Sequence, residues 1–232
     1  GRYPSLPRFI DELRELRMAA LLHDVGKITT PEYIVDKATK LETIYDRIGL
    51  LQARFEILKR DVRIAALMRN REAPRERGGD ACRQAGDAGE RPGEPDAGQL
   101  EDDFAFLAQI NTGEEFLADG VIERVLHIAL RTWDRDGDAQ PLITADELRN
   151  LLVRRGTLND EERTVVNNHV AVTYKMLSQL PFPKKLRRVA GFAAAHHEKL
   201  DGTGYPFGLQ GDELPLQARI LALADVFEAL TA

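Results

Sequence analysis

The chain has 232 residues and a formal net charge of -6 at pH 7, from 32 Lys and Arg against 38 Asp and Glu. This length allows one large domain, or one domain with a substantial insertion. The acidic balance argues against binding to DNA or RNA polymers, because that mode needs clustered basic side chains. The single cysteine, Cys82, excludes an internal disulfide and fits a reducing compartment.

No stretch of the sequence reaches the roughly 20 apolar residues that span a bilayer, and none resembles a secretory signal. We therefore expect a cytoplasmic domain, and whether a longer parent protein is membrane-tethered stays open. The chain begins at Gly1 and stops within a helical pattern, so we expect a fragment that is truncated at both ends.

Apolar residues recur at helical intervals through almost the whole chain, and no run alternates with period two, which predicts an all-α fold. Phe9, Leu13 and Leu16 mark the first helix. From Leu41 to Ala65 the apolar residues step by three and four in turn, as in a coiled coil or a long helical hairpin. A core helix explains this second pattern equally well.

Residues 71–98 combine three prolines with many glycines and charges. Such a composition cannot bury enough apolar surface to offset the entropy lost on ordering. We therefore expect a flexible tract here, near the tip of two antiparallel helical arms. A helical pattern resumes at Phe104 and, after an interruption near Gly113, continues from Leu117 to Trp133.

The last third of the chain carries the clearest helix signals. Asn159 can cap a helix with Glu162, three residues later, as its reciprocal partner, and Pro181 ends this helix. His169 lies on it. Two further helices are expected, over about 184–198 and about 216–231.

The segment "LLHDVGK" places His23 and Asp24 at the end of an apolar helix, followed by Lys27. A carboxylate next to an imidazole suits iron, manganese or zinc, which take nitrogen and bridging oxygen ligands together. Such a pair can also cap or hydrogen-bond a helix end, so this structural interpretation stays open while the pair is considered alone.

The metal interpretation gains weight when the polar residues on apolar helices are considered together. They are His23, Asp24, His169, His196, His197 and Asp225. An unpaired polar group in such a setting costs about 1–3 kcal/mol or more, so these residues need a common partner. The fifth histidine of the chain, His127, lies in the arm region without acidic company, and we assign it a structural role.

Four motifs, in this order, resemble the HD-GYP domain, a branch of the HD superfamily of metal-dependent phosphohydrolases. They are "HDVGK" at 23–27, "NNHV" at 167–170, "HHEKLDGTGYP" at 196–206 and "ARILALADVFEALTA" at 218–232. The resemblance covers residues 8–37 and 155–232. The block from about residue 41 to residue 154 has no counterpart in the minimal domain.

The resemblance implies an HD-type helical bundle with an inserted long helical hairpin. The catalytic core would comprise residues 1–40 and 155–232, and the insertion residues 41–154, with the flexible tract at 71–98. It also implies a homodimer formed through helical segments and a sensory domain in the full-length protein.

The resemblance further implies two or three divalent metal ions, with iron or manganese expected. The implied metal ligands are His23, Asp24, His169, His196, His197 and Asp225. The implied catalytic residues are Asp24, which bridges two ions, and Lys27, which contacts the substrate phosphate. Substrate binding would involve Lys27, Gly204, Tyr205 and Pro206. We expect Glu198 and Asp201 to orient the imidazoles by accepting their outer N–H groups, and ligation by Glu198 stays open.

Members of the resembled family hydrolyse the bacterial second messenger cyclic di-GMP to linear pGpG or GMP, and the resemblance implies this activity here. Two alternatives stay open: an inactive or truncated module that acts as a nucleotide sensor or protein-interaction domain, and a hydrolase of another phosphorylated nucleotide. The family usually carries a further histidine upstream and a basic segment downstream. We therefore expect an incomplete metal site in this chain.

Overall fold

The computed structural model describes residues 6–72 and 96–231, and its described residues are mostly helical. Within them the strands form a single two-stranded hairpin, so the predicted all-α fold class is confirmed. The chain divides into two compact units, Gly1–Val35 with Asp160–Ala232 and Asp36–Asn159. None of the helices described is both long and apolar enough to cross a membrane.

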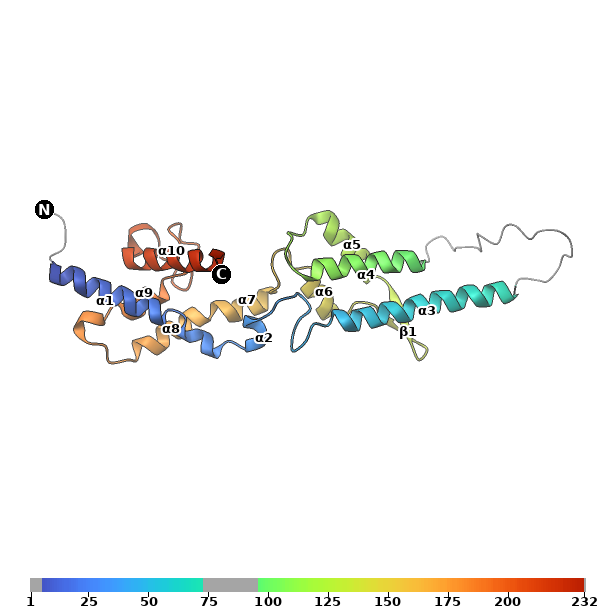
Figure 1. The fold of residues 1–232 in the computed structure, drawn as a ribbon, viewed down its shortest axis with the longest axis horizontal. Coiled ribbons are helices and arrows are strands. Elements are labelled where there is room, and N and C mark those ends of the chain that lie inside the picture. The colour runs from blue at the N-terminus through green and yellow to red at the C-terminus, as the bar shows by residue number, and fades with distance from the viewer. Residues whose placement is uncertain (1–5, 73–95, 232) are drawn as a thin grey trace. The chain divides into compact units, whose positions relative to one another are not determined.

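The first unit is built from two separate stretches of the sequence (Figure 1). The first stretch contains α1 (Leu6–Leu22), the 3-10 helix η1 (Val25–Thr29) and α2 (Glu32–Val35). The second contains α7 (Asp160–Asn167), α8 (His169–Ser178), η2 (Lys184–Leu186), α9 (Val189–Ala194), η3 (Gly211–Glu213) and α10 (Leu216–Thr231). Helices α1, α9 and α10 pack on one another, and α8 contacts both α9 and η1.

A small apolar core joins the helices of the first unit. Ala19 of α1, Leu177 of α8, Phe192 of α9 and Leu221 of α10 are buried in one cluster. Full burial of a large apolar side chain contributes roughly 1.5–3 kcal/mol. The core therefore fixes the spacing of the helix ends, and those ends carry the histidines.

The last two predicted helices and the helix of His169 differ in how closely they match the structure. The helix expected over about 216–231 is confirmed by α10. The helix expected over about 184–198 is shorter, because α9 ends at Ala194 and the two adjacent histidines lie just beyond it. The helix expected to carry His169 is broken at Asn168 into α7 and α8. Helical periodicity does not register such single-residue breaks.

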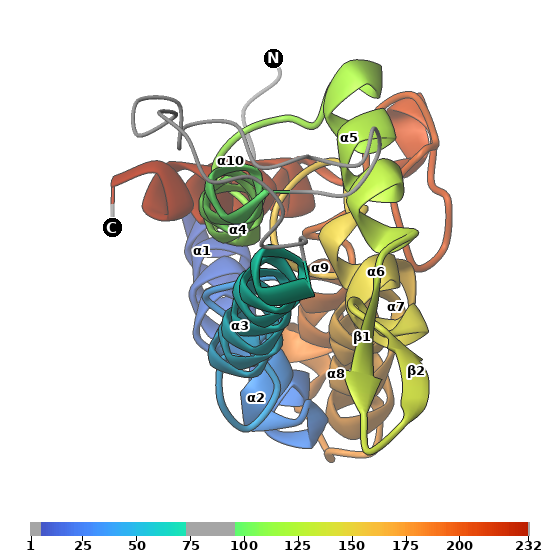
Figure 2. The ribbon, with the colours of Figure 1, turned by 90° about the vertical axis from the view of Figure 1, so that its right-hand side faces the viewer.

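The second unit contains the predicted helical hairpin. Its helices are α3 (Ile48–Glu72), α4 (Ala97–Asn111), α5 (Asp119–Ala129) and α6 (Ala145–Leu151). Figures 1 and 2 show α3 and α4 side by side and antiparallel, and the rings of Phe55 and Phe104 meet at 5.6 Å. The tract 71–98, predicted to be flexible, lies mostly in residues outside the described part, and its two ends are helical, in α3 and α4.

The start of the predicted seam is not helical. Leu41 and Ile44 precede α3, and although Leu41 is fully buried in the core of this unit, Ile44 is 91% exposed. The two ends of the second unit meet, because the Thr157 hydroxyl donates to the Lys37 carbonyl at 3.0 Å.

The prediction that the helix continues to Trp133 is wrong, because Trp133 lies in a strand. Helix α5 stops at Ala129, and β1 (Thr132–Arg135) pairs antiparallel with β2 (Asp138–Pro141). Asp136 and Gly137 form the turn with φ of 56° and 92°, and an Asp-Gly pair accommodates two positive φ angles in a two-residue hairpin. The strands are short and mostly exposed, so the apolar alternation that signals a strand is missing.

A buried ion pair links α3 to α6 within the second unit. The Arg54 guanidinium donates to Glu147 Oε1 at 2.5 Å and to the Leu142 carbonyl at 2.6 Å. Burial, the largest single effect, would raise the pKa of Glu147, but the hydrogen bonds from Arg54 and Thr144 and the charge of Arg54 together lower it. The pair therefore stabilises the fold above the ordinary pKa of a glutamate, and this contribution is lost as the pH falls through the lowered value.

We expect Glu147→Ala to lower the free energy of unfolding of the second unit by about 3–5 kcal/mol at pH 7, because Arg54 would stay buried without its partner. Urea unfolding followed by circular dichroism measures the change. The control Glu101→Ala removes a carboxylate that is 58% exposed and 3.3 Å from Lys59 on the surface, and should leave the midpoint nearly unchanged. Equal losses in the two variants would contradict the assignment.

Candidate metal centre

Three histidines of the first unit share one local arrangement. Each follows the end of a helix, and its Nδ1 atom meets the backbone carbonyl three residues earlier. The distances are 2.8 Å for His23 to Ala20, 2.5 Å for His169 to Val166 and 2.5 Å for His196 to Ala193. The last carbonyls of a helix lack partners within the helix, so they are free to accept. Because a carbonyl only accepts, each Nδ1 carries a hydrogen, and Nε2 is the atom left to ligate a metal when the ring is neutral.

The three Nε2 atoms converge on the carboxylate of Asp24. The distances are 3.3 Å from His23 to Oδ2, 3.2 Å from His169 to Oδ1 and 3.9 Å from His196 to Oδ1. Asp225 Oδ1 of α10 lies 3.5 Å from the same Nε2 atom of His23. Residues just beyond the ends of α1 and α9, at the start of α8 and within α10 therefore lie close together.

His197 completes the cluster. Its ring lies 4.0 Å from that of His196 and 5.4 Å from that of His169, measured between centroids. One candidate ligand atom from each of His169, His196 and His197 lies within 4.8 Å of the other two. The structure thus brings together all six residues proposed as ligands, while His127 lies exposed on α5 of the second unit.

The buried polar atoms of this cluster fit a metal ion. Asp24 Oδ1, His169 Nε2 and His196 Nε2 are buried without a hydrogen-bond partner among the described residues. Each such atom costs about 1–3 kcal/mol if nothing satisfies it. Imidazole nitrogens and carboxylate oxygens are ligands that iron, manganese and zinc accept. The cluster can therefore hold divalent metal, in keeping with the metal dependence of HD domains.

The electrostatics of the cluster favour the ligating forms of most of its members. Burial lowers the pKa of His196, and it lowers the pKa of His197 to about 4. Burial alone would raise the pKa of Asp24, but the close approach of His169, His23 and Lys27 to its carboxylate keeps it well below its usual range. His23 is the exception, because its hydrogen bond with Asp24 raises its pKa to about 9. A metal ion would have to displace the proton of His23.

Gly26 and Thr173 hold the His23–Asp24 turn against α8. The Gly26 amide donates to the Thr173 hydroxyl at 2.9 Å, and that hydroxyl donates to the His23 carbonyl at 3.0 Å. A Cβ atom at Gly26 would collide with the carbonyl oxygen of His169. Sequence reasoning missed both positioning roles, since Thr173 is far from the turn in sequence and its contact exists only in the folded chain.

The proposed substrate-binding residues lie around the cluster. The Lys27 ammonium is 2.7 Å from Asp24 Oδ2, and the Lys27 side chain is 46% exposed. The Tyr205 ring stacks on His197 at 5.0 Å with an interplanar angle of 25°. Burial, together with Asp225 and Asp24, raises the pKa of Tyr205 to about 12, so its hydroxyl keeps its proton at neutral pH. Pro206 follows Tyr205 through a cis peptide bond and is exposed.

Glu198 and Asp201 do not meet the imidazoles as expected. The carboxylate of Glu198 accepts from the amides of Phe207, Gly208 and Leu209, and Asp201 Oδ1 accepts from the amide and hydroxyl of Thr203. Backbone carbonyls take the Nδ1 protons instead, because they lie on the same chain segments as the rings.

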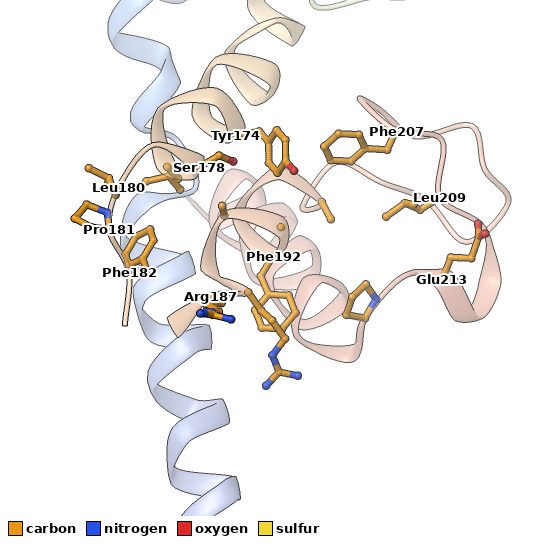
Figure 3. A pocket seen from close by; sticks show the side chains of 16 residues that line it. Tyr174, Ser178, Leu180, Pro181, Phe182, Arg187, Phe192, Phe207, Leu209 and Glu213 are labelled. Carbon is orange, nitrogen blue, oxygen red and sulfur yellow. The ribbon is translucent and has the colours of Figure 1, made fainter. Parts of the chain in front are cut away.

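Two cavities border this part of the first unit. A cavity of about 410 Å³ is lined by His196, His197 and Asp225 among others, and it opens on the cluster. A larger cavity of about 740 Å³ is mostly apolar, and Figure 3 shows Tyr174 and Phe207 facing each other at one edge of it. Among the described residues, its lining includes none of the six candidate ligands. The chemistry of the site therefore belongs to the smaller cavity.

Comparison with known families agrees with this geometry. Two family models, both described as HD domain, match the chain, one over residues 6–131 and the other over residues 144–232. The first alone covers more than half of the chain. The chain therefore belongs to the HD domain family, and the HD-GYP assignment drawn from its motifs is confirmed.

Several curated bacterial proteins are similar to part of the chain. The 3'3'-cGAMP-specific phosphodiesterase 3 of Vibrio cholerae is 49% identical over 82 residues, which are 35% of this chain and 17% of that protein. A cyclic di-GMP phosphodiesterase response regulator of Xanthomonas campestris is 42% identical over 81 residues, 35% of this chain and 21% of its own. A cyclic di-GMP phosphodiesterase of Thermotoga maritima is 37% identical over 82 residues, which are 35% of this chain and 22% of that protein. The chain thus spans about a fifth of the length of these relatives.

We expect Gly26→Ala to weaken metal binding by roughly 10–100-fold, because the added methyl group pushes the turn away from His169 and separates the ligands. Isothermal titration with Mn²⁺ measures the affinity. The control Gly49→Ala places a methyl group on α3 where nothing lies within 4 Å, and should bind metal like the parent chain. Unchanged affinity in Gly26→Ala would show that the close contact does not position the ligands.

Proposed function

We propose that this chain is a metal-dependent phosphodiesterase domain that hydrolyses cyclic di-GMP to linear pGpG, GMP or both in bacterial second-messenger signalling. The convergence of the histidine Nε2 atoms on Asp24, beside the loop that carries Gly204, Tyr205 and Pro206, is the observation that carries this proposal. The names of the relatives, which are phosphodiesterases of cyclic dinucleotides, support it.

We infer that two or three divalent ions, iron or manganese, bind at the six-residue cluster. Asp24 suits the bridging role, since its Oδ1 faces His169 and His196 while its Oδ2 faces His23 and Lys27. His197 extends the cluster from His196, and Asp225 extends it from His23. Such ions, when bound, supply the positive charge that makes water a better nucleophile near neutral pH and stabilises charge on a phosphodiester.

The remaining residues bind and orient the nucleotide in this proposal. The Lys27 ammonium, held beside Asp24, donates to the non-bridging oxygens of the phosphate and offsets their charge. In this role Lys27 donates hydrogen bonds and does not act as a base. The Tyr205 ring, fixed against His197, offers an aromatic edge and a protonated hydroxyl to a guanine.

We expect Asp24→Ala to lower turnover of cyclic di-GMP by more than about 100-fold, because it removes the shared ligand, and loss of even an indirect partner of a metal costs about 10–100-fold. Metal content by elemental analysis should fall in the same variant. The control His127→Ala alters a histidine of the second unit and should keep both activity and metal. Full turnover by Asp24→Ala would defeat the mechanism.

A second candidate substrate is 3'3'-cGAMP, favoured by the relative that is 49% identical over 82 residues and is named for that nucleotide. The two cyclic dinucleotides share both phosphodiester linkages and one guanine, so the same cluster serves either. Comparison of kcat/KM for the two nucleotides, with the same metal-loaded protein, decides between them. Binding of either without turnover would instead indicate a nucleotide sensor.

We further propose that the domain acts in the cytoplasm, beside a sensory domain of a longer protein, and dimerises through helical segments. Exposed apolar side chains on α10 support the dimer, with Leu223 72%, Phe227 67% and Leu230 81% exposed. Light scattering of the chain measures the association, and a monomer at every concentration tested would contradict it.

A further inference from the structure

The carboxylate of Glu198 holds a loop rather than a metal or an imidazole. Glu198 is only 4% exposed and directly follows His197. Its Oε1 accepts from the amides of Phe207 at 2.6 Å and Gly208 at 3.2 Å, and its Oε2 accepts from the amide of Leu209 at 2.9 Å. Hydrogen bonds to an ionised acceptor are roughly twice as strong as neutral ones. Three consecutive amides are therefore fixed to one buried charge.

The other end of the same loop is fixed at the same place. The Tyr205 amide donates to the His197 carbonyl at 3.3 Å, in addition to the stacking of the two rings. Gly204 lies so close to the backbone of Glu198 that a Cβ atom there would collide with the Glu198 Cα atom. The segment 204–209 is thus tied at both ends to the pair formed by His197 and Glu198.

Packing on the outer side of this loop is incomplete. Phe207 is 48% exposed and touches Tyr174 edge to face at 5.2 Å, and Leu209 lies farther along the same cavity (Figure 3). The cavity measures about 740 Å³, so few atoms press on the loop from that side. The loop consequently depends on the hydrogen bonds from its inner side for its position.

We propose that Glu198 is a positioning residue for nucleotide binding, which clamps the loop 204–209 so that Tyr205 stays against the metal-ligand candidate His197. This inference rests on the proposed function for its substrate, a cyclic dinucleotide. Glu198 acts through the loop, because the hydrogen bonds of its carboxylate go to loop amides and to none of the six candidate ligands. Its loss should weaken nucleotide binding while metal binding persists.

Glu198→Gln tests the charge and leaves the size of the side chain unchanged. A carboxamide has one acceptor oxygen, and its NH₂ group can only donate, so it faces at least one backbone amide with the wrong polarity. We expect amide hydrogen exchange in peptides covering residues 205–209 to become at least about tenfold faster. We expect KM for cyclic di-GMP to rise about tenfold, with kcat within about threefold and bound metal per chain equal to the parent value.

Asp212→Asn is the matched control. Asp212 lies between the loop 204–209 and α10, and its side chain is fully exposed, so the change removes a carboxylate that holds no buried amide. It should leave exchange, metal content and KM unchanged. If Glu198→Gln fails to fold, Glu198→Asp, which keeps the charge but shortens the reach, takes its place in all three measurements.

Parent-like exchange at residues 205–209 in the variant overturns the clamp. Loss of metal together with faster exchange also overturns it, since Glu198 would then act on His197 and not on the loop. If the parent chain hydrolyses no cyclic dinucleotide, the proposed function fails by itself. The exchange and metal measurements still decide the role of Glu198 in that case.

Discussion

The carboxylate of Asp24, surrounded by imidazoles, is the constraint on which the first unit depends. Segments distant in sequence bring His169 and His196 to this carboxylate beside His23, and Asp225 of α10 contacts His23. Each of these side chains would be costly to bury alone. The rings of His23, His169 and His196 are oriented by carbonyls of their own helix ends. The geometry of the centre therefore depends on how the ends of α1 and α9 and the start of α8 pack beside α10, and the small apolar core sets that packing.

The sequence predicted the parts of the fold that helical periodicity controls. Long helices such as α3 and α10 repeat the pattern often enough to be recognised. Histidines and acidic residues on or next to apolar helical segments pointed to the metal cluster. The β1–β2 hairpin escaped notice because its strands are exposed and carry no apolar alternation, although the Asp136-Gly137 pair was a usable turn signal. The break at Asn168 leaves no trace in the spacing of apolar residues.

Roles that arise from contacts across the fold were out of reach. Thr173 became a partner of Gly26 only because α8 docks on η1, and no local pattern announces that contact. Glu198 was expected beside the imidazoles, a sensible partner for histidines that bind metal. The free carbonyls at the helix ends bind the imidazole Nδ1 atoms instead. The carboxylate of Glu198 accepts from the backbone amides of the following loop.

The hydrogen bond between Thr157 and Lys37 affects how easily the residues of the centre come together during folding. It joins the point where the chain enters the second unit to the point where the chain leaves it. Once that unit has folded, the long tether between Asp24 and His169 behaves as a short one, and each halving of the tether lowers the entropy cost of closure by about 0.6 kcal/mol. Prior folding of the inserted unit would thus ease the search by which the ligands find one another.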